Sequence, residues 1–204
     1  MKRSGMDVPS TALFGVLYAD PPWDYPESGG GNRVVSAHYP TMTAEDICAL
    51  RVPAADNAVL YLWATAPKLR EALAVISAWG FEYKTHAVWD KELIGMGYWF
   101  RGQHDLLMLG IRGKVTAPPP ELRIGSVIRA RRSKHSAKPD TVRDLIGRWF
   151  PNERKLELFA RPWTDLWPKH DGWETWGNEM ANDVELSTPN ATAHVRDRSE
   201  AEGT

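Results

Sequence analysis

Short hydrophobic stretches recur along the chain, each closed by proline, glycine or a polar residue. Stretches of this length, rich in β-branched and aromatic side chains, predict buried β-strands. The clearest is the first, because it is all but continuous in its apolar character and ends at two consecutive prolines. The six predicted strands cover residues 15–20, 58–63, 83–89, 106–111, 126–130 and 155–160.

Three segments between these strands have the periodicity of helices. Thr43 is suited to cap a short helix that runs through Leu50, with acidic residues in its first turn. A second helix is predicted over residues 67–79, before Gly80. A third is predicted to have Pro139 as its first helical residue and to end before Pro151. The predicted buried faces are Leu69, Leu73 and Ile76 in the second helix, and Val142, Leu145, Ile146 and Trp149 in the third.

Strands that alternate with helices favour an α/β fold built on a mostly parallel sheet. Such sheets bind ligands beyond the carboxyl ends of their strands, so the functional residues are expected there. Residues 1–180 are expected to form one domain. Residues 181–204 are polar and contain no Phe, Tyr or Trp, and we expect them to form a disordered tail.

The charge balance and the cysteine content narrow the classes of function. The formal net charge of the 204-residue chain is -1, so binding to nucleic acid would depend on a local basic surface. Cys48 is the single cysteine, which excludes an internal disulfide framework and a multi-cysteine zinc site. The histidines do not have metal-ligand spacing, and no metal is expected. Without a signal peptide or a membrane-length apolar run, a cytoplasmic protein is expected.

The first strand is followed by Asp20, Pro21, Pro22 and Trp23, and this tetrapeptide is the strongest candidate for chemistry. The two prolines lack N–H donors, so the backbone offers only carbonyl acceptors beside the Asp20 carboxylate. Two neighbouring acceptors suit a ligand nitrogen that carries two hydrogens, such as N6 of adenine. Trp23 is predicted to stack on the base. A strand-ending turn is the alternative interpretation of the prolines alone.

The tetrapeptide and several later motifs together resemble the MT-A70-like N6-adenine methyltransferases. The resemblance covers about residues 16–179 and implies a Rossmann-like fold that uses S-adenosylmethionine. It also implies a circularly permuted order, with the catalytic strand first and the cofactor strand, residues 155–160, late in the chain. The other matching segments are 38–42, 62–65, 97–100 with 104–107, 110–113, 135–140, 154–161 and 176–179.

The resemblance assigns roles to individual residues. It makes Asp20 and Pro21 the acceptors of the target amine, within a catalytic set completed by Pro22, Trp23 and Tyr39, of which Tyr39 lines the pocket of the target base. The family often has Glu where this chain has Asp105, and Gln where it has Glu179. The residues expected to contact the cofactor are Asp20, Lys138, Glu157, Arg161, Asn178 and Glu179.

Some of these residues have simpler interpretations. Glu157 could be a paired carboxylate of the core, because an unpaired Glu is rarely buried. Lys138 could be a surface charge. Trp23, Trp99 and Trp176 could be core side chains rather than ligand contacts.

A dense basic stretch precedes Lys138 and is a candidate phosphate track beside the active site. The alternative is a solvated loop. The expected substrate contacts are Arg129, Arg131, Arg132 and Lys134, together with Tyr39.

The expected substrate is adenine in nucleic acid, with DNA favoured over RNA. The adenine must be single-stranded or flipped out, because N6 within a duplex is not accessible to the methyl donor. The chain has little room for a separate recognition domain, so a homodimer or a second subunit is a possible partner. Three alternatives stay open: a catalytically silent binding subunit, an RNA adenosine methyltransferase, and an amine methyltransferase that acts on protein or a small molecule.

Overall fold

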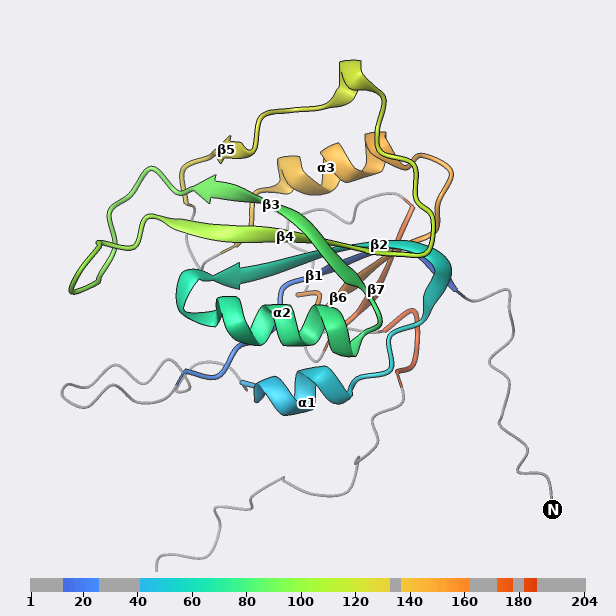
Figure 1. Ribbon diagram of the computed structural model, residues 1–204, viewed down its shortest axis with the longest axis horizontal. Helices are drawn as coiled ribbons and strands as arrows, with labels where there is room; N and C mark the ends of the chain where they lie inside the picture. Colours follow the sequence, from blue (N-terminus) through green and yellow to red (C-terminus); the bar gives the residue numbers. More distant parts are fainter. Residues whose placement is uncertain (1–12, 26–40, 133–136, 162–171, 178–181, 187–204) are drawn as a thin grey trace, which may run out of the picture.

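The computed structural model describes residues 13–25, 41–132, 137–161, 172–177 and 182–186. Within these residues a seven-stranded sheet forms the middle layer, in the order β5-β3-β4-β2-β1-β6-β7 (Figure 1). All six predicted strands are present: the first is shifted by one residue, the second to fourth are longer than predicted, and the last two are shorter. The strands are β1 (Phe14–Ala19), β2 (Ala54–Thr65), β3 (Glu82–Asp90), β4 (His104–Arg112), β5 (Val127–Arg129), β6 (Lys155–Leu158) and β7 (Trp173–Trp176).

The sheet is mostly parallel, as the sequence predicts. β1 lies between β2 and β6 and is parallel to both, and β6 and β7 are also parallel. β4 is the exception, because it runs antiparallel to β2 and to β3. The amino end of β4 therefore lies at the same edge as the carboxyl ends of β1, β2 and β3, and it brings its first residues to the edge where ligands are expected.

Helices cover both faces of the sheet (Figure 1). Side chains alternate along β1, so Val16 and Tyr18 pack on the face covered by α3, while Leu17 and Ala19 pack on the face covered by α1 and α2. No helix in the described ranges is long and apolar enough to cross a membrane. The helices are α1 (Ala44–Ala49), α2 (Leu69–Ala78) and α3 (Asp140–Trp149), with 3₁₀ turns η3 (Ala66–Lys68) and η4 (Pro120–Leu122).

Thr43 caps α1 as predicted, because its hydroxyl accepts a hydrogen bond from the Asp46 N–H at 3.1 Å. The predicted buried face of α2 is wrong for two of its three residues. Leu69 and Leu73 are exposed, and the buried stripe is Ala72, Val75, Ile76 and Trp79.

Close contact between α2 and the sheet explains this shift. A Cβ on Gly110 of β4 would lie 3.1 Å from the Ile76 side chain, so the helix approaches the sheet where the facing residues are small. The larger side chains Leu69 and Leu73 lie on the exposed flank of the helix.

In α3, Pro139 is the N-cap residue rather than the first helical residue, a shift of one position. Val142, Leu145 and Ile146 are buried as predicted, and Trp149 is half-buried.

Strand β7 is not among the predicted strands. It has four residues, and only Trp173 and Thr175 are buried, which is too short an alternation to recognise in the sequence. The packed chain also continues beyond residue 180, where the polar tail was expected to begin. The Asp183 carboxylate accepts hydrogen bonds from the Thr175 N–H at 3.0 Å and hydroxyl at 2.9 Å. Val184 and Leu186 contact the core, so apolar burial holds this segment against β7.

Candidate active site

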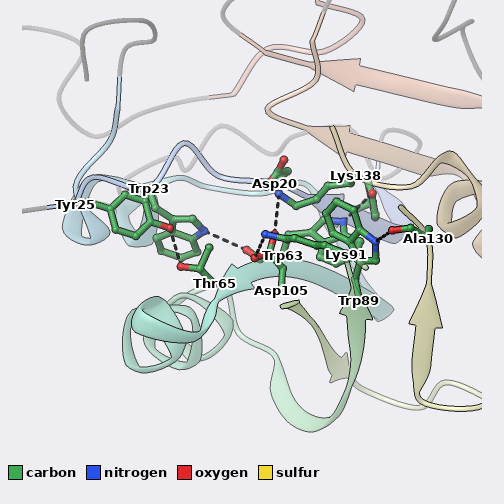
Figure 2. Close-up of polar contacts among 11 residues, drawn as sticks. Asp20, Trp23, Tyr25, Trp63, Thr65, Trp89, Lys91, Asp105, Ala130 and Lys138 are labelled. Atoms are coloured by element: carbon green, nitrogen blue, oxygen red, sulfur yellow. Dashed lines mark hydrogen bonds and ion pairs between the residues drawn. The ribbon is translucent and has the colours of Figure 1, made fainter. Parts of the chain in front are cut away.

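Four charged side chains form a connected row at the carboxyl edge of the sheet (Figure 2). Lys138 Nζ lies 2.8 Å from Asp20 Oδ1 and 3.8 Å from Asp105 Oδ2. Lys91 Nζ lies 2.7 Å from Asp105 Oδ1. The row therefore runs Asp20–Lys138–Asp105–Lys91, with alternating charges.

The alternation explains how these charges are tolerated away from water. The Asp105 side chain is only 6% exposed, and an isolated carboxylate at that depth would be strongly destabilising. Two ammonium groups on opposite sides compensate it. The geometry leaves Lys138 shared between two carboxylates, which fixes its Nζ beside Asp20.

Aromatic rings form the floor beneath this row. The Trp63 indole N–H donates to the Tyr18 hydroxyl at 2.7 Å, and Trp63 meets Trp89 edge to face at 5.9 Å between ring centroids. Lys138 Nζ lies 5.6 Å from the Trp63 ring centroid, and Lys91 Nζ lies 5.3 Å from that of Trp89. Burial raises the pKa of the Tyr18 hydroxyl well above its ordinary value, so this group stays a neutral hydrogen-bond partner.

The tetrapeptide after β1 has backbone partners on both prolines. The Pro21 carbonyl accepts from the Trp23 N–H at 2.9 Å, and the Pro22 carbonyl accepts from the Met42 N–H at 2.8 Å. These contacts hold the chain in one path beside Asp20. A carbonyl oxygen has two lone pairs, so the Pro21 carbonyl can also accept a hydrogen from a ligand.

Trp23 itself occupies a different place from the one predicted. Its side chain is 6% exposed, it packs in the core under α1 and α2, and its indole N–H donates to the Trp63 carbonyl at 3.1 Å. A ring with so little free surface does not offer a face for stacking on a base. The core interpretation of Trp23 is therefore the correct one, and its role is to hold the tetrapeptide against β2.

A second polar cluster lies on the neighbouring strand β6. Arg143 Nη1 donates to both carboxylate oxygens of Glu157 at 2.9 Å, and the same guanidinium contacts Asp140. Burial alone would lower the pKa of Arg143, but the Glu157 charge and the hydrogen bonds outweigh it, and the pKa is raised. Glu157 is thus a paired carboxylate that lies beside Tyr18 in the sheet register.

The ends of β6 and β7 approach each other closely just beyond this cluster. The Ala160 N–H donates to the Trp176 carbonyl at 2.9 Å. A Cβ on Gly177 would lie 2.1 Å from the Ala160 carbonyl oxygen, so no other residue fits this crossing without a backbone shift. Phe159, with φ of 62°, turns the chain out of β6 and stacks edge to face on Trp176.

The structure brings together part of the predicted site. Lys138 contacts Asp20, and Pro21 follows Asp20 in the chain, so these three residues lie at one edge of the sheet. Glu157 lies on the adjacent strand β6, and Arg161 is exposed beyond the end of that strand. The basic residues at and after the end of β5 are exposed, as a phosphate track requires: Arg129, Arg131 and Arg132. Four predicted residues lie outside the described part of the chain: Tyr39, Lys134, Asn178 and Glu179.

Sequence reasoning missed Lys91 and Arg143, and it noted Asp105 only as a departure from the family pattern. Lys91 comes directly after β3, so the rule for carboxyl ends of strands could have identified it. Asp105 is near the start of its strand, and its position in the site depends on the antiparallel direction of β4. Arg143 lies on a helix with an ordinary amphipathic pattern, which carries no such signal.

Comparison with known proteins gives one consistent result. Residues 14–179 match the family model described as MT-A70. The type II methyltransferase M.MunI of a Mycoplasma species is 34% identical over 196 residues, which are 86% of this chain and 82% of that protein. The MT-A70-like N(6)-adenosine-methyltransferase of Drosophila melanogaster is 30% identical over 187 residues, which are 86% of this chain and 28% of that protein.

The human N(6)-adenosine-methyltransferase catalytic subunit METTL3 is 28% identical over 202 residues, which are 95% of this chain. The chain spans about a third of the length of METTL3, since the match covers 32% of that protein. The family model covers most of this chain and includes both the tetrapeptide and the Lys138 segment. The chain therefore belongs to the MT-A70 family of methyltransferases.

Proposed function

We propose that this protein transfers a methyl group from S-adenosylmethionine to N6 of adenine in DNA. The observation that carries the proposal is the Asp20 carboxylate, held at 2.8 Å by Lys138 beside two prolines that donate no hydrogen. This is an acceptor pair for an amine, placed over an aromatic floor at the carboxyl edge of the sheet.

The residues act on the amine in a defined way. The lone pair of adenine N6 is delocalised into the ring, which makes it a weak nucleophile. Hydrogen bonds from its two hydrogens to Asp20 and to the Pro21 carbonyl favour a pyramidal nitrogen, whose lone pair is then directed away from the ring. Positive charge that develops on the nitrogen is stabilised by the Asp20 carboxylate, which is also placed to accept the proton that N6 loses.

Lys138 orients this carboxylate. It engages Asp20 Oδ1, which leaves the Oδ2 oxygen as the proposed acceptor for the amine. Because Asp105 also attracts the ammonium group, Lys138 is restrained by two carboxylates. Lys91 completes the restraint by holding Asp105 from the far side.

Support for the cofactor comes from the chemistry of the donor set. The described residues include a lysine suited to a carboxylate, Lys138, and a strand carboxylate suited to ribose hydroxyls, Glu157. The Arg143 guanidinium compensates the buried charge of Glu157. When bound, S-adenosylmethionine supplies a methyl group on a positively charged sulfur. Arg161, Asn178 and Glu179 complete the proposed contacts.

Support for a DNA substrate comes from the surface charge and from the relatives. Arg129, Arg131 and Arg132 are exposed at the end of β5, beside the active-site row. M.MunI, a type II methyltransferase, matches this chain over most of both lengths, whereas the named adenosine methyltransferases are several times longer. We therefore favour DNA over RNA, with the adenine single-stranded or flipped out of its duplex.

The proposal extends to the organisation of the protein. Residues 1–180 are proposed as the catalytic domain, with residues 182–186 held against it by Asp183 and the remaining polar tail beyond. The compartment is proposed to be the cytoplasm, in keeping with the single Cys48. A second copy or another subunit that widens the contact with nucleic acid is compatible with so compact a chain.

A panel of methyl acceptors tests the proposal. The purified protein is incubated with radiolabelled S-adenosylmethionine and with single-stranded DNA, duplex DNA, RNA or a protein mixture. We expect label in adenine-containing DNA and none in oligonucleotides without adenine. Label in protein alone would contradict the proposal, and cofactor binding without transfer to any acceptor would identify a silent subunit instead.

A further inference from the structure

The loop between β3 and β4 carries the most exposed aromatic side chains of the described residues. Tyr98, Trp99 and Phe100 are 105%, 96% and 91% exposed, and Ile94 and Met96 are also largely exposed. Isolated exposed apolar residues are ordinary, but a group of five on one loop marks an interaction surface. We call residues 91–103 the aromatic loop.

Internal hydrogen bonds give the aromatic loop a defined shape. The Gly95 N–H donates to the Gly102 carbonyl at 2.8 Å, and the Gly102 N–H donates to the Met96 carbonyl at 2.9 Å. Arg101 Nε donates to the Gly95 carbonyl at 2.7 Å. Gly97 has φ of 150°, and a Cβ there would lie 2.0 Å from the Phe100 carbonyl oxygen, so the tight turn requires glycine. These contacts hold the backbone that carries the three aromatic rings in one conformation.

The loop begins and ends at the active-site row. Lys91, at its start, pairs with Asp105, and the Lys91 N–H donates to the Gln103 carbonyl at 2.9 Å. Gln103 also donates to Asp90 at 2.9 Å, which ties the two ends of the loop together. The loop projects from the sheet at the carboxyl end of β3 (Figure 1). The loop therefore extends from the same edge of the sheet that carries the proposed target pocket.

Basic residues run beside the same loop. The Arg132 N–H donates to the Lys91 carbonyl at 3.1 Å, and the Ala130 N–H donates to the Asp90 carbonyl at 3.2 Å, so residues 129–132 are fixed along the base of the loop. Five cations stand here against three acids, Asp90, Glu92 and Asp105, in a chain whose net charge is -1. The five cations are Lys91, Arg101, Arg129, Arg131 and Arg132.

We infer that the aromatic loop is a stacking platform for unpaired bases of the substrate nucleic acid, flanking the adenine that enters the active site. Rings that accept the faces of bases, next to cations that follow the phosphates, are the combination that binds single strands with little sequence preference. A self-association surface would need no such run of arginines beside it. This inference rests on the proposed function, because it names how that substrate is held.

The test compares two sets of variants in binding a fluorescent single-stranded oligonucleotide at several salt concentrations. Replacing Tyr98, Trp99 and Phe100 together by Ala removes the rings. Replacing Arg129, Arg131 and Arg132 together by Gln removes the proposed phosphate contacts. The matched control replaces Leu69 and Leu73, which are exposed on α2, by Ala.

We expect the ring variant to bind more weakly by about tenfold for each ring that stacks on a base, at every salt concentration and with an unchanged salt slope. The arginine variant should show a shallower slope, by about 0.7 for each phosphate that the variant no longer neutralises. The leucine control should bind like the wild type. Methyl transfer by the ring variant should need more oligonucleotide and reach a similar maximal rate.

Two results would overturn the inference. One is wild-type affinity in the ring variant while the wild type methylates the oligonucleotide, in which case the proposed function stands without the platform. The other is a dimer of the wild type that becomes monomeric in the ring variant on sedimentation, which would make the loop an interface between copies. A wild type that neither binds nor methylates the oligonucleotide would instead contradict the proposed function and the inference with it.

Discussion

Asp20 and Lys138 are far apart in the sequence, and their contact defines the site at the scale of single residues. A lone carboxylate at the end of β1 could adopt several rotamers, and each would place its oxygens differently. Contact with a lysine that is itself held by Asp105 selects one arrangement before a substrate arrives. Preorganised acceptors of this kind stabilise a transition state without the cost of reorganising solvent.

Replacing Asp20 by Ala should reduce methyl transfer by at least about a hundredfold, the usual effect of removing one aimed polar group. The dissociation constant of S-adenosylmethionine should change much less than kcat, because the removed carboxylate acts on the amine. Initial rates and calorimetric titration measure the two quantities. Asp24→Ala is the control, since Asp24 is exposed in the same segment. Near-normal turnover by Asp20→Ala would rule out this role.

Lys91 and Asp105 should be coupled in stability. Lys91→Met leaves a buried carboxylate facing only the more distant Lys138, and Asp105→Asn leaves Lys91 beside a neutral amide. We expect each single variant to lower the free energy of unfolding, and the double variant to lose less than the sum, with a coupling of about 0.5–3 kcal/mol. Denaturation in urea measures the cycle. Strictly additive losses would show that the row does not act as a unit.

At the scale of elements, the sequence predicts the features that depend on residues within the same helix or strand. β1 is a continuous apolar run, α1 begins at a side-chain cap, and α3 has apolar residues regularly spaced along one face. The structure confirms all three elements. The antiparallel direction of β4 depends on which strands it joins, and that is not encoded in its own residues. The buried stripe of α2 depends on the small residue Gly110 in a strand more than thirty positions later. Tertiary contacts decided these features.

The residues of the site likewise fall into those that the sequence identifies and those whose position depends on the fold. Asp20, Pro21 and Lys138 lie in recognisable motifs, and the structure places them at one edge of the sheet. The contact between Asp105 and Lys91 depends on the pairing of β3 with β4, which is visible only in the fold. Trp23 was predicted as a stacking residue because it belongs to the tetrapeptide, yet its indole is buried. A motif identifies which residues act together and does not say which way each side chain points.

Gly177→Ala should weaken the junction of β6 and β7. The new Cβ would collide with the Ala160 carbonyl, so the strand ends must separate. We expect a lower melting temperature and weaker S-adenosylmethionine binding, because Glu157, a proposed cofactor contact, lies in β6 beside this junction. Gly147→Ala is the matched control, since nothing lies within 4 Å of its added Cβ in α3. That control should stabilise the protein by up to about 1 kcal/mol. Equal melting temperatures for the two variants would contradict the packing argument.

At the scale of the whole molecule, one edge of the sheet carries the chemistry and the two faces carry the helices. The charged row lies at the carboxyl edge (Figure 2), and the aromatic loop and residues 129–132 lie at the same edge (Figure 1). The apolar layers under α1 and α2 and under α3 hold β1 and β6 side by side. The proposed amine acceptor and the proposed ribose acceptor are therefore carried by adjacent strands of one rigid sheet.

A ligand that binds only the folded protein raises its stability by mass action. S-adenosylmethionine at about a hundred times its dissociation constant should therefore add roughly 2.7 kcal/mol, seen as a higher melting temperature. S-adenosylhomocysteine should act similarly, and Asp20→Ala should retain most of the shift. Glu157→Ala should lose most of it. An unchanged melting temperature of the wild type with either compound would contradict the proposed cofactor.

The position of the transferred methyl group tests the proposed reaction most directly. The wild type and Asp20→Ala are incubated with methyl-deuterated S-adenosylmethionine and a single-stranded DNA containing adenine, or an RNA of the same sequence. The nucleosides are then separated and identified by mass spectrometry. The proposed mechanism predicts labelled N6-methyladenine in the DNA, more than in the RNA, and its loss in Asp20→Ala. A labelled methyl group on another atom of the base, or equal labelling by Asp20→Ala, would contradict it.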